Sequence, residues 1–123
     1  MSSARPRVLL ADDDAGILKA FERLLTPSCE VVGRVTHIGE LVEAATRLQP
    51  DVVVVDLYMP TGSGLEACHH LREAVPRAKI IVVSGADDMR IRDEAIRAGA
   101  SVYVPKVRAA EDLLPAIQAS TVD

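Results

Sequence analysis

The sequence contains no tryptophan, and its only aromatic residues are Phe21, Tyr58 and Tyr103. Because hydrophobic residues still make up 49% of the chain, the core must be built mainly from aliphatic side chains. The two cysteines, Cys29 and Cys68, lack the close spacing of metal-binding or redox pairs. We therefore interpret both as small, buried hydrophobic residues.

Long hydrophobic runs are also missing. No run approaches the length of a membrane-spanning helix, and the apolar residues 8–11 are too few for the core of a signal peptide. The net charge of -4 argues against nucleic acid as a direct partner. We expect a cytoplasmic, soluble protein without membrane contact, forming one domain over residues 1–123 with its core at about 6–119.

The segment 51–60 is the most informative stretch of the chain. Four consecutive valines, residues 52–55, are β-branched and too apolar for a strand with one wet face. Such a run fits a strand buried on both faces of a parallel sheet. The run ends in Asp56, and Pro60 soon prevents further regular pairing. An aspartate in this position often only caps a turn, so the neighbouring segments decide its role.

Short apolar runs alternate five times with helical patterns. Strands are predicted at residues 7–11, 30–35, 52–56, 79–83 and 102–104, and helices at about 14–25, 38–49, 64–75, 88–98 and 112 onward. This order predicts an α/β fold: a single doubly wound (βα)5 domain of flavodoxin-like architecture, with a five-stranded parallel sheet in the order 2-1-3-4-5. Pro105 favours an edge position for the fifth strand.

Several residues are interpreted as structural. Asp14 is expected to cap the first helix, and Asp87-Asp88 the fourth. Gly62 and Gly64 are expected to let their loop turn tightly. Asp112 would cap the last helix and leave Pro115 in its first turn. The histidines, which lack acidic partners at metal-binding spacing, are expected to serve the surface or packing: His37, His69 and His70.

Acidic residues follow two strands that the predicted topology places side by side. Asp12, Asp13 and Asp56 should therefore meet where ligands bind in open α/β sheets. Three carboxylates in one pocket need a proton, a cation or a permanent positive partner, and oxygen ligands alone suit a hard cation such as Mg²⁺. The fourth strand leads to Ser84 and Gly85 and the fifth to Lys106, which adds a hydroxyl and an ammonium group. Together these groups predict an aspartyl-phosphate site.

The same residues carry a family resemblance. The chain resembles the receiver domains of two-component response regulators over nearly its whole length, and most resembles receivers that precede a LuxR-type helix-turn-helix. The segments that carry the resemblance are residues 10–14, 51–60, 64–66, 83–85 and 99–106.

The resemblance implies a role for each matching residue. Asp56 is the implied phospho-acceptor, which takes a phosphoryl group from a histidine kinase or a phosphotransfer protein. Asp13, Asp56 and the backbone carbonyl of Tyr58 are the implied Mg²⁺ ligands, and Asp12 reaches the ion through water. Ser84 and Lys106 contact the phosphoryl oxygens.

The resemblance also implies a switch. Tyr103 is its aromatic residue, turning inward as Ser84 moves toward the phosphate. The surface of the fourth helix, fifth strand and fifth helix would then bind an output domain or partner, or a second copy upon phosphorylation. Such a domain is not an enzyme beyond its own phosphorylation and slow dephosphorylation.

Four positions bear on how closely the chain follows the usual receiver-domain pattern. Ser84 stands where threonine is common, and Val107 follows Lys106 where many relatives have proline. Tyr58 and Ala86, with Gly85, flank the phosphoryl site, and neither Tyr58 nor Ala86 helps to orient water. We therefore predict slow self-dephosphorylation.

Three other classes of protein share parts of this pattern. A flavodoxin-like cofactor binder needs hydrogen-bond donors where this chain has three aspartates. A phosphatase of the haloacid dehalogenase type needs a second acid where this chain has Tyr58. A receiver-like interaction module that works without phosphorylation remains an open alternative.

Overall fold

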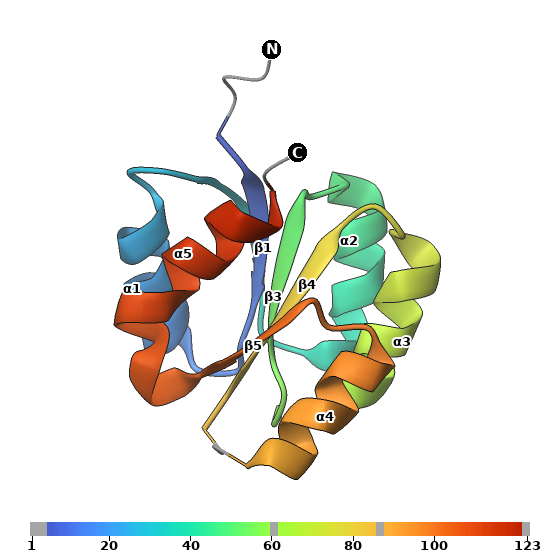
Figure 1. Ribbon diagram of the computed structural model, residues 1–123. Coiled ribbons are helices and arrows are strands. Elements are labelled where there is room, and N and C mark those ends of the chain that lie inside the picture. The colour runs from blue at the N-terminus through green and yellow to red at the C-terminus, as the bar shows by residue number, and fades with distance from the viewer. Residues whose placement is uncertain (1–4, 60–61, 86–87, 122–123) are drawn as a thin grey trace.

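The computed structural model describes residues 5–59, 62–85 and 88–121. A central parallel sheet is covered by α1 and α5 on one face and by α2, α3 and α4 on the other (Figure 1). The strands are β1 (Arg7–Ala11), β2 (Glu30–Val35), β3 (Val52–Asp56), β4 (Lys79–Ser84) and β5 (Val102–Pro105). The helices are α1 (Ala15–Leu25), α2 (Leu41–Leu48), α3 (Gly64–Ala74), α4 (Met89–Ala98) and α5 (Ala109–Ser120), with short 3₁₀ turns at Ile38–Glu40 and Lys106–Arg108.

The strand order is β2-β1-β3-β4-β5, with all four strand pairs parallel. The predicted topology is therefore confirmed, including the edge position of β5. The order reverses between β1 and β3, so their carboxyl ends bound the crevice where ligands bind in such sheets.

The valine run of β3 is buried on both faces, as predicted. Val53 and Val55 pack into the core beneath α2, α3 and α4. Val52 and Val54 pack into the core beneath α1 and α5. Because alternate side chains of a strand point to opposite faces, a single apolar strand supports both cores.

Two of the predicted helix caps are confirmed. Asp14 Oδ1 accepts hydrogen bonds from the amides of Gly16 and Ile17 at 2.8 and 3.2 Å. Asp88 Oδ1 accepts one from the amide of Arg90 at 2.8 Å. Asp87 lies outside the described residues. Both cysteines are buried free thiols, as expected, and burial raises the pKa of Cys68 to about 11.

The predicted start of the last helix is wrong. α5 begins at Ala109, one turn before Asp112, because the 3₁₀ turn at Lys106–Arg108 leads directly into it. Asp112 does not cap the helix; its carboxylate pairs with Arg108, four residues earlier. Pro115 consequently lies inside α5, on its exposed side, where it lacks the N–H for the usual helical hydrogen bond.

The loop after β3 turns at Gly62, whose amide donates a hydrogen bond to the carbonyl of Met59 at 3.2 Å, but neither Gly62 nor Gly64 uses a positive φ value. Among the described residues, only Gln49 and Gly99 have positive φ values. Gly62 and Gly64 instead allow close contacts. A Cβ on Gly62 would lie 2.8 Å from the side chain of Ile38, and one on Gly64 would lie 2.5 Å from the carbonyl oxygen of Leu57.

Within the described part of the chain, no helix combines the length and the apolar character that crossing a membrane requires.

Candidate functional site

The carboxyl end of β1 delivers Asp12, whose side chain is almost fully buried. The amide of Asp12 continues the sheet by donating to the carbonyl of Val35, at 3.0 Å. Asp12 Oδ1 accepts a hydrogen bond from the amide of Asp14, at 2.9 Å. Asp13 is exposed between them. The turn after β1 thus directs Asp12 inward while Asp14 caps the following helix.

The carboxyl end of β3 delivers Asp56, which is only 4% exposed. Its Oδ1 accepts a hydrogen bond from the amide of Tyr58, at 3.2 Å. The next residue, Leu57, donates its amide to the carbonyl of Val83 in β4, at 3.0 Å. The backbone that leaves β3 is therefore held against β4 immediately beyond the aspartate.

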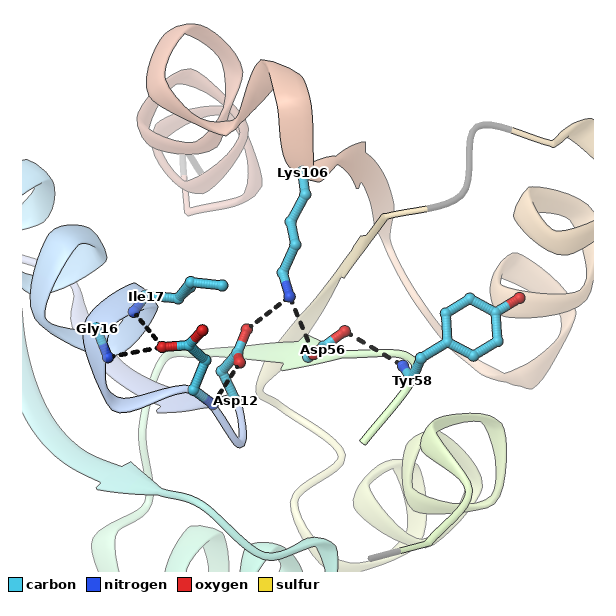
Figure 2. Close-up of polar contacts among 7 residues, drawn as sticks. Asp12, Gly16, Ile17, Asp56, Tyr58 and Lys106 are labelled. Atoms are coloured by element: carbon cyan, nitrogen blue, oxygen red, sulfur yellow. Dashed lines mark hydrogen bonds and ion pairs between the residues drawn. The ribbon is translucent and has the colours of Figure 1, made fainter. Parts of the chain in front are cut away.

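Lys106 bridges the two buried aspartates from the end of β5 (Figure 2). Its Nζ donates a hydrogen bond to Asp56 Oδ2 at 3.1 Å. Nζ also lies 3.1 Å from Asp12 Oδ2 in an ion pair. No hydrogen bond to Asp12 Oδ2 is found among the described residues, so its contact with Lys106 is an ion pair.

Burial and the neighbouring charges shift the pKa values of both Asp12 and Lys106. Burial is the largest influence on Asp12 and raises its pKa, and the charge of Asp56 adds to this; the amide of Asp14 and the ammonium of Lys106 offset it only in part. Burial by itself would lower the pKa of Lys106. The two carboxylates outweigh that effect and hold its pKa above the ordinary value of 10.5.

The residues fit a hard divalent cation. Asp12, Asp13 and Asp56 each offer a carboxylate oxygen within 4.8 Å of the others. One ammonium group serves the two buried carboxylates, and a buried oxygen of Asp12 has no hydrogen-bond partner among the described residues. Carboxylate oxygens without histidine or cysteine ligands favour Mg²⁺ over softer metals. The predicted convergence of the three aspartates is therefore confirmed.

Three other predicted site residues lie at the same edge or next to it. Ser84 is fully buried at the end of β4, in register with Pro105 of β5, and Gly85 follows it. Tyr103 is half-buried on β5 and packs against the core on the side of α2, α3 and α4. Ala86 lies outside the described residues.

The side chain of Tyr58 does not enter the cluster. Its ring is 55% exposed and extends away from Lys106 and Asp12 (Figure 2). The three histidines are exposed, consistent with their surface interpretation: His37, His69 and His70.

Two features of the site were not found from the sequence. Lys106 contacts both buried aspartates, whereas the sequence indicated only its presence at the edge. Gly64 places α3 directly on the backbone of Leu57. A glycine at the start of a helix, eight residues after the key aspartate, was the available signal, but the sequence alone does not distinguish close approach from turning.

Comparison with known proteins agrees with this geometry. Residues 8–118 match the sequence model of the response regulator receiver domain. Over 101 residues the chain is 37% identical to the chemotaxis protein CheY of Thermotoga maritima, covering 81% of this chain and 84% of that protein. Over 105 residues it is 40% identical to a protein-glutamate methylesterase/protein-glutamine glutaminase of Geobacter metallireducens, covering 81% of this chain but only 30% of that protein.

Solved structures share the architecture. A two-component response regulator of the LuxR family from Aurantimonas superposes with a TM-score of 0.88 at 31% identity, covering 94% of this chain and 84% of that one. This neighbour is consistent with the LuxR-type resemblance of the sequence. The chain spans about half the length or less of several curated relatives, among them the methylesterase (30%) and the response regulator MprA of Mycobacterium leprae (50%).

Proposed function

The chain belongs to the response regulator receiver domain family, and from this premise we propose that it is a phosphorylation-controlled switch of a two-component system. The observation that carries the proposal is the convergence of Asp12, Asp13, Asp56 and Lys106 at the carboxyl edge of β1, β3 and β5. A structural role alone would not require two buried carboxylates to share one ammonium group.

Asp56 is the proposed phospho-acceptor. A carboxylate oxygen of Asp56 forms a bond to phosphorus as the P–N bond of a donor phosphohistidine breaks, and the donor imidazole leaves. The product is a mixed carboxylic–phosphoric anhydride. Two groups already near the carboxylate prepare it: the amide of Tyr58 and the ammonium of Lys106 hydrogen-bond one oxygen each, which orients the side chain.

Asp13, Asp56 and the backbone carbonyl of Tyr58 would hold Mg²⁺, with Asp12 reaching the ion through water. When bound, Mg²⁺ would supply positive charge that offsets repulsion between the carboxylates and an incoming phosphoryl group. Lys106 would pair with the phosphoryl oxygens, a charge-assisted contact for which its raised pKa keeps it protonated.

Ser84 and Tyr103 form the proposed switch. Ser84 would donate its hydroxyl to the phosphoryl group of modified Asp56, and Tyr103 would turn inward as the end of β4 moves. Contacts made in only one state bias the equilibrium between two arrangements of this region. The surface of α4, β5 and α5 would transmit the change to an output domain, a partner protein or a second copy in the cytoplasm.

The experiment is an intact-mass measurement after incubation with acetyl phosphate, with and without Mg²⁺. The proposal expects the gain of one phosphoryl group, dependent on Mg²⁺. A folded protein that binds Mg²⁺ and gains no mass would contradict it and favour a receiver-like module that acts without phosphorylation.

Slow loss of the phosphoryl group is expected because the exposed Tyr58 side chain extends away from the aspartate cluster, so its hydroxyl is not directed toward water beside Asp56 (Figure 2). Tyr58→Asn should shorten the lifetime of the phosphoryl group by about tenfold, less than the roughly hundredfold or more that a proton-transferring side chain contributes, because asparagine can only orient the water. Decay of the added mass measures the lifetime. Tyr58→Phe is the matched control and should leave it unchanged; equal lifetimes in Tyr58→Asn and the wild type would refute the expectation.

A further inference from the structure

Gly64 is the first residue of α3 and lies against the backbone that leaves β3. A Cβ at this position would lie 2.5 Å from the carbonyl oxygen of Leu57, 2.8 Å from its Cα and 2.9 Å from its carbonyl carbon. All three atoms belong to the backbone, so no side-chain rotation can relieve the contact. Any residue other than glycine must displace either α3 or Leu57.

The reason for glycine at this position is space and not backbone conformation. The positive φ values among the described residues belong to Gln49 and Gly99. Alanine would suit the helical conformation of Gly64 better than glycine does, by about 1 kcal/mol in a helix interior. The close approach to Leu57 is therefore the feature that requires a residue without a side chain.

Leu57 joins the two groups on which the site depends, the carboxylate of Asp56 and the carbonyl of Tyr58. Its amide is held by the carbonyl of Val83 at 3.0 Å, and its carbonyl side lies against Gly64. β4 and α3 thus enclose this residue from two directions. A shift of Leu57 would move Asp56 and Tyr58 together.

We propose that Gly64 is a positioning residue for the Mg²⁺ and phosphoryl site, because its missing side chain lets α3 rest on Leu57 and hold the Asp56–Tyr58 backbone in place. This inference rests on the proposed function, since the groups that it positions are the phospho-acceptor and a proposed metal ligand. Gly64 itself touches neither phosphate nor metal.

Gly64→Ala is the test, with Mg²⁺ affinity measured by calorimetry and folding checked by circular dichroism and thermal unfolding. We expect Mg²⁺ binding to weaken by about tenfold or more, the scale observed when groups that orient metal ligands are altered. Octahedral Mg²⁺ sites tolerate little displacement of their ligands.

Gly39→Ala is the matched control. The same atoms are added at a position where a Cβ would meet nothing within 4 Å, at the 3₁₀ turn Ile38–Glu40. Its Mg²⁺ affinity should equal that of the wild type. A loss of affinity in Gly39→Ala equal to that in Gly64→Ala would overturn the inference, because it would show a general response to added volume.

If Gly64→Ala does not fold, Ser63→Ala provides the test. Ser63 Oγ accepts a hydrogen bond from the amide of Glu66 at 3.2 Å, so its removal loosens the first turn of α3 without adding atoms. We expect weaker Mg²⁺ binding by this variant at a temperature where it is fully folded, and an unchanged affinity would overturn the inference.

The failure of this inference and the failure of the proposed function give different results. Wild-type Mg²⁺ binding together with an unchanged affinity in Gly64→Ala, at any thermal stability, would overturn the positioning role alone. Absence of Mg²⁺ binding by the wild type would overturn the proposed function and this inference with it.

Discussion

Two aspartates flank the same strand, and their environments differ in almost every respect. Asp51 precedes β3 and is exposed; its Oδ2 accepts a hydrogen bond from the amide of Arg7, at 2.9 Å. Asp56 ends β3 and is buried beside Asp12 and Lys106. Asp51 completes the hydrogen bonding of the sheet, whereas Asp56 places a buried carboxylate at the carboxyl edge, where the strand order reverses.

The difference follows from the direction of the strands. At the amino end of β3, the backbone of Asp51 continues the ladder through Arg7 and Lys79, both at 2.9 Å. At the carboxyl end, the strands diverge into separate loops at the point where the strand order reverses. The same residue type is therefore a hydrogen-bonding partner of the sheet at one end and, at the other, the buried carboxylate that we propose as the phospho-acceptor.

Phosphorylation provides the largest expected contrast. Asp56→Asn should abolish the Mg²⁺-dependent gain of a phosphoryl group, because an amide oxygen is a poor nucleophile. Asp51→Asn removes the same charge from the other end of the strand and should leave the gain intact. Intact mass after treatment with acetyl phosphate and Mg²⁺ measures the phosphoryl gain of each variant. Equal gains in Asp56→Asn and Asp51→Asn would refute the different roles of the two aspartates.

Mg²⁺ affinity should depend on the residues of the acidic cluster and not on the adjacent Asp14. Asp13→Asn should weaken Mg²⁺ binding by at least about tenfold, a loss that even altered outer-shell partners can cause. Asp14→Asn is the matched control, because asparagine caps a helix about as well as aspartate. Calorimetric titration of each variant measures the affinity; a comparable loss in Asp14→Asn would contradict the assignment.

Lys106→Met should lower the free energy of unfolding by about 2 kcal/mol at pH 7, because it leaves two buried carboxylates without their cation. The pKa of Lys106 in the folded state is above the ordinary value of 10.5, so its stabilising contribution is complete below pH 10.5. The contribution is lost as the pH rises through the folded-state value.

Urea unfolding between pH 7 and pH 12 measures this dependence. As the pH rises above 10.5, the free energy of unfolding of Lys106→Met should fall less than that of the wild type. Added Mg²⁺ should raise the free energy of unfolding of Lys106→Met more than that of the wild type. The exposed Lys19 provides the control: Lys19→Met should follow the wild-type profile. Identical profiles for Lys106→Met and the wild type would show that the bridge contributes nothing to stability.

The smallest effect is expected at the amino end of the strand. Asp51→Ala should cost about 1 kcal/mol of stability or less, the value of one hydrogen bond at an exposed position. Mg²⁺ affinity should be unchanged. A stability loss as large as that of Lys106→Met, measured by urea unfolding, would mean that Asp51 has a larger role than one hydrogen bond.

Much of this architecture could be predicted from the sequence. The valine run, the alternation of strands with helices and Pro105 are local signals, and together they favour a parallel sheet with β5 at an edge, as in the observed order. The meeting of Asp12, Asp13 and Asp56 follows from that order alone, because parallel strands share their carboxyl edge.

Other features depend on contacts that no local pattern encodes. The ammonium of Lys106 lies between two carboxylates because of the length of its side chain and the course of the backbone after β5. Gly64 carries no pattern that separates close approach from a tight turn. The start of α5 depends on the preceding 3₁₀ turn, which overrides the capping signal at Asp112.

The location of the phosphoryl group tests most directly whether Asp56 is the phospho-acceptor. An acyl phosphate on aspartate is reduced by borohydride to homoserine, which fragment masses assign to a single position. After treatment with acetyl phosphate and Mg²⁺, we expect homoserine at position 56 and unmodified aspartate at positions 12, 13 and 51. Homoserine at another position, with Asp56 unmodified, would contradict this assignment.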